Sequence, residues 1–259
     1  MSELSTLYWT SASRTHTGAV RKANEDACME MAEQGLWVVA DGMGGHASGA
    51  TASKMVIDVL KDVDTAAPLS NSLDAVRSRL SDATGRLRQT ALQQRDAVVA
   101  RTVVVFLARD RHCVCLWAGD SRAYLYREGQ LKRLTRDHTQ VEELVAQGIM
   151  DREQAQSSVS SNIITRAIGA NNPLELDAEL LEAQDGDLYL LCSDGLTNEV
   201  SDEEIGNALA GGHCDYASMA LLELALRRGA RDNVTLIVMR ADDAEHPTKT
   251  VFNHPPATT

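Results

Sequence analysis

Trp37-Val38-Val39-Ala40-Asp41-Gly42 joins a short apolar run to an aspartate, and two other segments repeat this pattern. They are Cys115-Leu116-Trp117-Ala118-Gly119-Asp120 and Tyr189-Leu190-Leu191-Cys192-Ser193-Asp194-Gly195. Asn24-Glu25-Asp26 and Arg231-Asp232-Asn233 add two more aspartates, the second at the head of another apolar run. A carboxylate at the end of a buried strand is costly to desolvate unless a cation compensates it. Several such carboxylates would repel one another, so the pattern predicts a polycarboxylate Mg²⁺ or Mn²⁺ site.

The bulk composition is that of an acidic globular protein. Its 259 residues allow one large domain or two small ones. A hydrophobic content of 44% supports a sizeable core, and 24% charged residues argues against disorder. The net charge of −12, from 25 Lys and Arg against 37 Asp and Glu, argues against non-specific binding to nucleic acid or to an anionic membrane.

The sequence carries no targeting signal that we recognise. Residues 1–6 have neither the basic nor the apolar part of a signal peptide, and no run of about 18 apolar residues occurs. The five cysteines form no C-x-x-C pair, and Cys113 and Cys115 share one face of a strand. We therefore expect packed thiols in a reducing compartment, the cytoplasm, and no membrane insertion.

Strands cluster along the chain more than they alternate with helices. Apolar and alternating runs predict strands over residues 7–14, 27–31, 36–40, 102–108, 113–118, 123–127, 176–181, 188–192 and 234–239. Helices are expected after Gly45 and over 73–93, 141–147, 201–210 and 216–228. This order favours mixed or antiparallel sheets covered by helices over a parallel doubly wound sheet. We expect one domain over residues 1–240, a polar flap at about 148–162, and a flexible tail over 241–259.

The glycine-rich segment after Asp41 has two interpretations. Gly42-x-Gly44-x-x-Ala47 matches the dinucleotide fingerprint, follows a strand and opens a helix. Asp41 would then place a negative charge beside the pyrophosphate, and no second strand ending on an acid follows the helix. In the other interpretation Asp41 ligates a metal, the glycines let the backbone approach closely, and Gly42 offers its carbonyl.

Other phosphatase and hydrolase chemistries lack their motifs. No cysteine has an arginine six positions later, as a C-x5-R loop needs. The seven histidines form no H-x-H or H-E-x-x-H pattern, which argues against a histidine-ligated zinc site.

Seven motifs together resemble a known family. In chain order they are Gly18-x-x-Arg21-x-x-Asn24-Glu25-Asp26, Val39-Ala40-Asp41-Gly42-Met43-Gly44-Gly45, Trp117-Ala118-Gly119-Asp120-Ser121-Arg122-Ala123-Tyr124, Leu134-Thr135-x-Asp137-His138, Ile164-Thr165-Arg166-Ala167-Ile168-Gly169, Cys192-Ser193-Asp194-Gly195-Leu196-Thr197 and Arg231-Asp232-Asn233-Val234-Thr235. Their order and spacing resemble the PPM family, the metal-dependent protein serine/threonine phosphatases of the 2C type, in its compact bacterial branch. The resemblance spans about Arg14 to Met239.

This resemblance implies an α+β fold, a four-layer α/β/β/α sandwich of two mainly antiparallel sheets flanked by helices. It implies a binuclear Mn²⁺ or Mg²⁺ centre at one edge, where Asp41 bridges both ions and the Gly42 carbonyl binds one. Asp194 and Asp232 would bind the other ion. By the same resemblance, Asp26 holds coordinated water, Asp120 joins Asp194 in a third, weaker site, and Arg21 grips the substrate phosphate.

The implied function is hydrolysis of phosphoserine and phosphothreonine on proteins, opposing a bacterial Ser/Thr kinase. Two metals about 3.5–4 Å apart lower the pKa of a bridging water and clamp the displacement. Arg21 adds a planar fork of donors for phosphate oxygens. The expected partners are phosphorylated proteins, a kinase among them, and the flap would help choose the substrate.

Several site residues also have plainer explanations. Arg21 alone is compatible with a surface ion pair, and Asp120 with a structural role. Asn24 is compatible with capping a turn, and Asn233 with fixing Asp232 through a hydrogen bond. Ser121 and Arg122 are expected to brace the strand end. The alternative function is a non-catalytic binding module, whose mark would be lost ligands; none of the core aspartates is missing.

Two positions depart from the family pattern. Met43 stands where some members carry a histidine that protonates the leaving oxygen, so His46 or a metal-bound water is left for that role. Ala100-Arg101-Thr102 replaces the usual Gly-Thr/Ser-Thr step before a strand. It indicates a packing change or a new basic group near the cleft.

Overall fold

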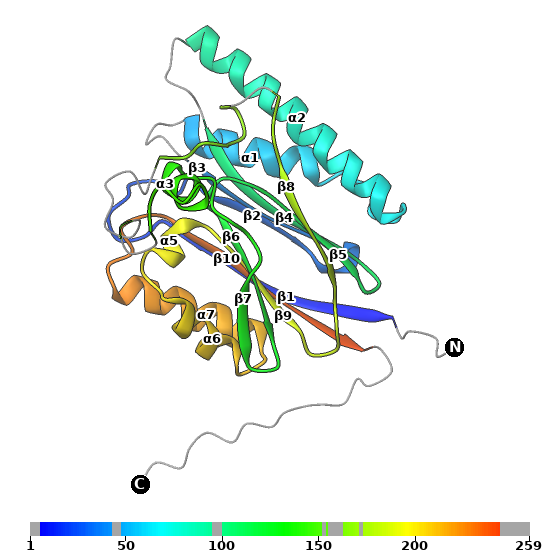
Figure 1. The fold of residues 1–259 in the computed structure, drawn as a ribbon. Coiled ribbons are helices and arrows are strands. Elements are labelled where there is room, and N and C mark those ends of the chain that lie inside the picture. Colours follow the sequence, from blue (N-terminus) through cyan, green and yellow to red (C-terminus); the bar gives the residue numbers. More distant parts are fainter. Residues whose placement is uncertain are drawn as a thin grey trace.

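Two sheets packed face to face, with helices outside each, form four layers (Figure 1). This computed structural model describes residues 6–42, 48–94, 100–151, 154, 163–170 and 173–243. Among these residues, every strand pair is antiparallel. The predicted α+β sandwich is confirmed.

Each sheet has five strands. The first has the order β1 (Leu7–His16), β10 (Val234–Asp243), β9 (Leu188–Cys192), β6 (Arg122–Arg127) and β7 (Gln130–Arg133). The second has the order β2 (Ala27–Met31), β3 (Leu36–Gly42), β4 (Arg101–Arg109), β5 (His112–Ala118) and β8 (Asp177–Glu182). A short 3₁₀ helix, η1 (Ala32–Gln34), connects β2 to β3.

Two pairs of helices form the outer layers. The helices α1 (Ser48–Leu60) and α2 (Leu69–Gln94) cover the second sheet, whereas α6 (Asp202–Leu209) and α7 (Cys214–Arg227) cover the first (Figure 1). The shorter α3 (Gln140–Ala146) and α5 (Asp194–Thr197) lie at one end of the sandwich. In the part of the chain that the structure describes, no helix is both long and apolar enough to cross a membrane.

Strand alternation divides the core into layers. Successive side chains of a strand point to opposite faces. In β3, Val38 therefore packs with α1 and α2, whereas Trp37 and Val39 pack between the sheets. Phe106 and Tyr189 meet in the same central layer, with ring centroids 4.8 Å apart.

Some element boundaries differ from the predictions. Glu128 and Gly129 connect β6 to β7, and their φ values of 51° and 80° suit a two-residue hairpin turn. The strand β7 that follows was not predicted. The strand β10 continues to Asp243, so the expected start of the tail at Ala241 is wrong for three residues. The rest of the tail lies outside the described residues, as does most of the flap, of which only 148–151 and 154 are described.

The dinucleotide interpretation is not compatible with this topology. The strand that follows α1 and α2 is β4, and it pairs antiparallel with β3. A dinucleotide-binding unit needs a parallel strand after its helix. The segment that carried the fingerprint, 43–47, itself lies outside the described residues.

Candidate active site

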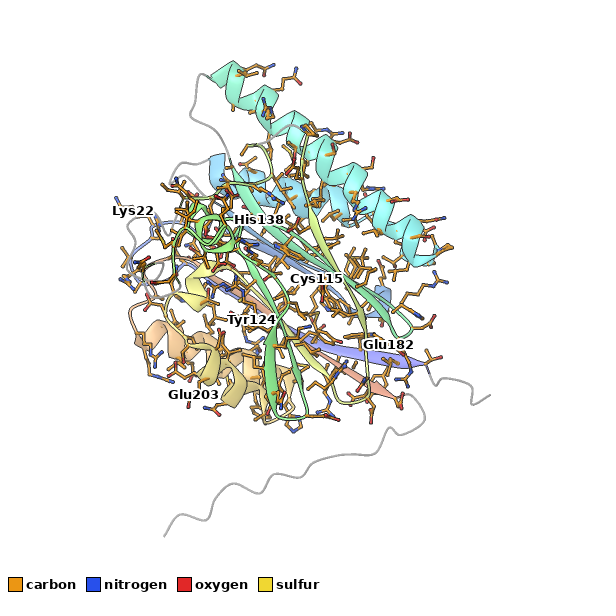
Figure 2. The ribbon with its side chains drawn as sticks, in the orientation of Figure 1. Lys22, Cys115, Tyr124, His138, Glu182 and Glu203 are labelled. Atoms are coloured by element: carbon orange, nitrogen blue, oxygen red, sulfur yellow. The ribbon has the colours of Figure 1, made fainter. Side chains whose placement is uncertain are left out.

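The predicted site aspartates lie at one end of the sandwich. Asp41 lies at the end of β3, Asp120 follows β5, and Asp194 begins α5 directly after β9. Asp232 lies just before β10, and Asp26 just before β2, which pairs Ala27 with Ala40 next to Asp41. In Figure 2, Lys22 and His138 mark this end of the molecule, and Glu182 marks the other.

The charges on these five side chains act on one another. Asp41 is buried, and its pKa is well above the usual range. Burial is the largest cause, followed by the negative charges of Asp26, Asp194, Asp120 and Asp232. The fold therefore brings the other four predicted aspartates within electrostatic range of Asp41.

The pKa values of Asp26, Asp120 and Asp194 are also raised, which favours the neutral forms of these carboxyls. Burial raises the pKa of Asp26 to about 6, although hydrogen bonds with the Thr235 and Ser193 side chains lower it. Burial, followed by the charge of Asp194, raises the pKa of Asp120 to about 8. Among the described residues, Oδ2 of Asp26 is buried without a hydrogen-bond partner. Such an oxygen, in a cluster with excess negative charge, is a suitable donor for a hard cation.

Carboxylate oxygens are suitable ligands for Mn²⁺ or Mg²⁺. The side chains, however, are not arranged as a complete set of ligands. Within the described residues, no group of three or more His, Cys, Asp or Glu side chains is arranged to hold an ion. Two contacts engage carboxylate oxygens of the cluster. Arg21 binds both carboxylate oxygens of Asp232, and Asn198 Nδ2 donates to Asp194 Oδ2 at 3.1 Å. The metal-binding roles of these aspartates therefore stay predictions.

Arg21 belongs to the site rather than to a remote surface ion pair. Its Nε and Nη2 atoms donate to Asp232 at 2.9 and 2.6 Å, and its side chain is 49% exposed. The hydrogen bond to Asp232 is the largest cause of the raised pKa of Arg21. A planar fork held half-exposed at the carboxylates has the form needed to bind a phosphate, but this role too stays a prediction.

Gly42 allows two segments of the site to approach closely. A Cβ atom at this position would lie 2.4 Å from the carbonyl oxygen of Glu25. Only glycine avoids this overlap, as we expected for a close approach of the backbone.

Asn233 holds the segment that carries Arg21 against the start of β10. Its Nδ2 donates to the carbonyls of Thr17 and Ala23 at 2.8 and 3.0 Å, and its Oδ1 accepts from the Glu25 amide at 2.8 Å. Its backbone N–H donates to Asp232 Oδ1 at 2.8 Å. The expected link to Asp232 therefore comes from the backbone of Asn233, while its side chain positions residues 17–25.

Asn24 caps the turn before β2. Its Oδ1 accepts from the Asp26 amide at 3.1 Å, and its Nδ2 donates to Thr15 Oγ1 at 2.7 Å. These contacts agree with the turn-capping role that the sequence allowed for Asn24.

A polar cluster braces the Asp120 turn. Ser121 Oγ lies 2.7 Å from Thr102 Oγ1, and Arg122 Nη2 donates to Asp137 Oδ2 at 2.8 Å. These contacts agree with the bracing role expected for Ser121 and Arg122.

His138 is joined to the backbone of the same turn. Its Nδ1 accepts from the Gly119 amide at 3.2 Å, its own amide donates to the Gly119 carbonyl at 2.9 Å, and its Nε2 lies 3.1 Å from Asp177. Burial lowers the pKa of His138. A neutral ring with the proton on Nε2 satisfies both contacts.

Sequence reasoning assigned no role to His138, Asp137 or Asn198. His138 and Asp137 both stand in the motif Leu134-Thr135-x-Asp137-His138. The sequence therefore did indicate that these two residues belong to the site. Asn198 follows Asp194 by four residues, which is one helical turn. This spacing brings the two side chains together only because the short helix α5 forms there. Met43 and His46, on which the identity of the general acid depends, lie outside the described residues.

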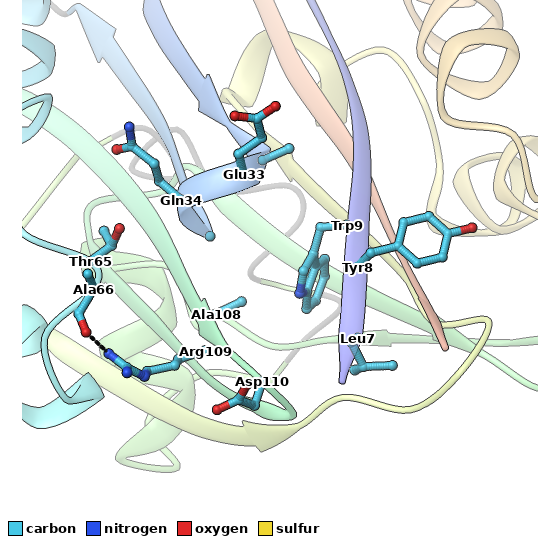
Figure 3. A pocket seen from close by; sticks show the side chains of 12 residues that line it. Leu7, Tyr8, Trp9, Glu33, Gln34, Thr65, Ala66, Ala108, Arg109 and Asp110 are labelled. Atoms are coloured by element: carbon cyan, nitrogen blue, oxygen red, sulfur yellow. Dashed lines mark hydrogen bonds between the residues drawn. The ribbon is translucent and has the colours of Figure 1, made fainter. Parts of the chain in front are cut away.

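A separate cavity of about 590 Å³ opens at the other end of the sandwich (Figure 3). Its lining includes Trp9, Gly35 and Arg109. Gly35 precedes β3 and Arg109 ends β4, whereas Asp41 lies near the opposite ends of those strands. The cavity is therefore distinct from the carboxylate cluster.

A family model described as "Protein phosphatase 2C" matches residues 12–223. The chain belongs to the protein phosphatase 2C family. The family resemblance seen in the motifs is thereby confirmed.

Solved structures and a curated relative agree with this family assignment. PppA, described as a key regulatory component of T6SS in Pseudomonas aeruginosa, is 41% identical with a TM-score of 0.86, over 92% of this chain and 99% of that one. The catalytic domain of the serine/threonine protein phosphatase PstP, in complex with 2 manganese ions, is 37% identical with a TM-score of 0.80, over 92% of this chain and 100% of that one. Serine/threonine protein phosphatase PstP of Mycobacterium tuberculosis is 36% identical over 93% of this chain and 46% of its own length. The chain thus spans about half the length of that curated relative.

Proposed function

We propose that this chain hydrolyses phosphoserine and phosphothreonine on proteins at a binuclear Mn²⁺ or Mg²⁺ centre. The observation that carries the proposal is the convergence of four other acidic side chains on Asp41, whose pKa is raised by burial and by their charges. Arg21 lies at the same cluster. The two manganese ions in the similar PstP catalytic domain support the choice of metal.

The oxygen atoms of the predicted site residues are the proposed ligands of the two ions. We expect Asp41, Asp194, Asp232 and the Gly42 carbonyl to hold two ions, with Asp26 orienting water and Asp120 contributing to a third, weaker site. When bound, the ions supply an acidified water and neutralise charge on the phosphate.

Arg21 orients the substrate in this proposal. The two N–H groups that bind Asp232 have the spacing to bind two oxygens of a phosphate. Binding phosphate in their place would release Asp232 for its expected ligand role. Asn233 holds the segment that carries Arg21 and so maintains the position of the fork.

The substrates and the opposing enzyme are inferred from the proposed reaction. The substrates would be phosphorylated proteins, and the opposing activity a bacterial Ser/Thr kinase, which is itself a candidate substrate. All five cysteines fall within the described residues and are free thiols, which supports a reducing compartment such as the cytoplasm.

The test is phosphate release from a phosphothreonine peptide by metal-stripped protein, with and without Mn²⁺ or Mg²⁺. We expect release only with metal. Asp194→Asn should abolish turnover while the protein stays folded, and Asp215→Asn, at an exposed aspartate paired with Arg14, should not. Arg21→Ala should raise KM about tenfold or more, because a charge-assisted bidentate contact is lost. Folded protein that releases no phosphate with either ion would instead favour a non-catalytic binding module.

A further inference from the structure

Arg101, one of the two departures from the family pattern, is a buried cation beside the carboxylate cluster. It begins β4 and pairs in register with Gly42, and the next pair joins Asp41 to Thr102. Its side chain is among the largest that are fully buried, with 1% exposure. Burying a guanidinium is costly unless nearby negative charge compensates it.

Backbone and side-chain contacts hold Arg101 in this position. Its amide donates to the Ile168 carbonyl at 2.9 Å, and its carbonyl accepts from the Ile168 amide at 2.7 Å. The side chain donates from Nη1 to the Ala100 carbonyl at 2.5 Å and from Nε to the Gly49 carbonyl at 3.3 Å. Gly49 lies in the first turn of α1. The guanidinium is therefore fixed between β4 and the start of α1.

Three carboxylates act on the charge of this group. A Cβ atom at Gly49 would lie 2.1 Å from Glu25 Oε2, so the Glu25 carboxylate packs against the residue whose carbonyl accepts from Arg101. The charges of Glu25, Asp41 and Asp26 favour the protonated form of Arg101, although burial is the larger effect and lowers its pKa.

We propose that Arg101 serves as a built-in cation of the carboxylate site. It offsets part of the negative charge when no metal is bound, and it thereby weakens the binding of a divalent ion. The inference rests on the metal site of the proposed function. The PPM pattern that the chain resembles has threonine or serine at this position, so the charge is a property of this chain.

Removing the Arg101 side chain should change the Mn²⁺ affinity in opposite directions for the charge role and for a purely structural role. If Arg101 only anchored Gly49, its removal would loosen the site and weaken metal binding. If its charge opposes the metal, its removal strengthens binding.

The test is isothermal titration calorimetry, in which Mn²⁺ is added to the metal-stripped protein at pH 7.5. We expect Arg101→Gln to bind Mn²⁺ about tenfold more tightly than wild type, because one fixed positive charge near the ion is lost. Arg101→Lys keeps the charge and should stay within about twofold of wild type. Arg79→Gln is the matched control, since Arg79 also donates to backbone carbonyls, those of Val59 and Asp62, but from the middle of α2. Its affinity should be unchanged.

Three results would overturn the inference. Arg101→Gln could bind Mn²⁺ no more tightly than wild type, or Arg101→Lys could tighten binding as much as Arg101→Gln does. Wild type that binds no Mn²⁺ would overturn the proposed metal site itself, together with this role of Arg101. If Arg101→Gln does not fold in chelator, Arg101→Thr takes its place with the same expected tightening.

Discussion

Asp41 is suited to bind a metal ion, but its buried carboxyl destabilises the fold when no metal is bound. Burial, followed by the charges of four other aspartates, raises the pKa of its carboxyl. Replacing this carboxyl with a neutral amide relieves the cost of burying it in the metal-free protein, while it also removes the expected bridging ligand. In the proposed function, activity and metal-free stability are therefore opposed at this residue.

Asp41→Asn should abolish turnover and raise the melting temperature of the protein in chelator. We expect an increase of about 2–4 °C, which corresponds to roughly 1 kcal/mol for a chain of this size. Differential scanning calorimetry in EDTA provides the measurement. The matched control is Asp187→Asn, at another buried aspartate, whose partner is the Arg127 guanidinium. The control should melt lower than wild type, because it leaves that guanidinium without its anionic partner. A lower melting temperature for Asp41→Asn would contradict the repulsion argument.

The aspartates of the site could be predicted because each stands in a recognisable local motif. The bond between Arg21 and Asp232 could not, since it joins residues that only the folded chain brings together. The same holds for Asn198, whose side chain reaches Asp194 only because α5 begins directly after β9. Local motifs identify the chemistry of single residues, whereas their pairing depends on the tertiary fold.

At the scale of elements, one asparagine links a loop to a strand. The Asn233 side chain makes three hydrogen bonds to the segment 17–25, and that segment carries Arg21. Asn233 is buried, so losing the amide leaves two backbone carbonyls and one amide without these partners.

Asn233→Ala should loosen residues 17–25 without unfolding the sandwich. We expect amide hydrogen exchange in this segment to increase about 10- to 100-fold, because each lost hydrogen bond contributes on the order of 1 kcal/mol. Exchange in α2 should not change. Asn207→Ala, at an exposed position on α6, is the control and should leave both regions as in wild type. If exchange in α2 rises as much as in 17–25, the asparagine supports the whole fold rather than this loop.

The prediction of elements succeeded where a strand has its own apolar pattern. The buried run of β3 is an example, with every residue from Leu36 to Asp41 buried. The edge strand β7 was missed because its four residues alternate between exposed and half-buried positions. The end of β10 was placed too early because pairing with β1, rather than its own sequence, extends it to Asp243.

At the scale of the whole molecule, the cluster makes metal-free stability depend on pH. The folded chain holds protons on Asp26 and Asp120 more tightly than the unfolded chain does, with pKa values of about 6 and about 8. Between the ordinary aspartate pKa and these values, the folded state binds more protons. Stability therefore falls as pH rises through that window.

The free energy of unfolding in chelator should be lower at pH 8.5 than at pH 5.5, as measured by urea denaturation. Saturating Mn²⁺ should reverse or flatten this slope, since a bound ion stabilises the ionised carboxylates and the folded state. Asp120→Asn is the control, and it should reduce the slope between about pH 5.5 and 8, because the pKa of Asp120 is raised to about 8 in the folded chain. A metal-free protein whose stability rises steadily over this range would show that the carboxyls are not held protonated by the fold.

The pairing of β1 with β10 has a consequence for biosynthesis. In the first sheet, β1 is an edge strand whose neighbour is β10, with Leu7 opposite Asp243 and His16 opposite Val234. A ribosome adding about 5–20 residues per second needs on the order of 10–50 s to synthesise the chain between these strands. Throughout that time the nascent β1 lacks its partner, so this sheet is completed only after β10 leaves the ribosome. Such non-local pairing is slow to form, and the waiting edge is a natural binding site for a chaperone.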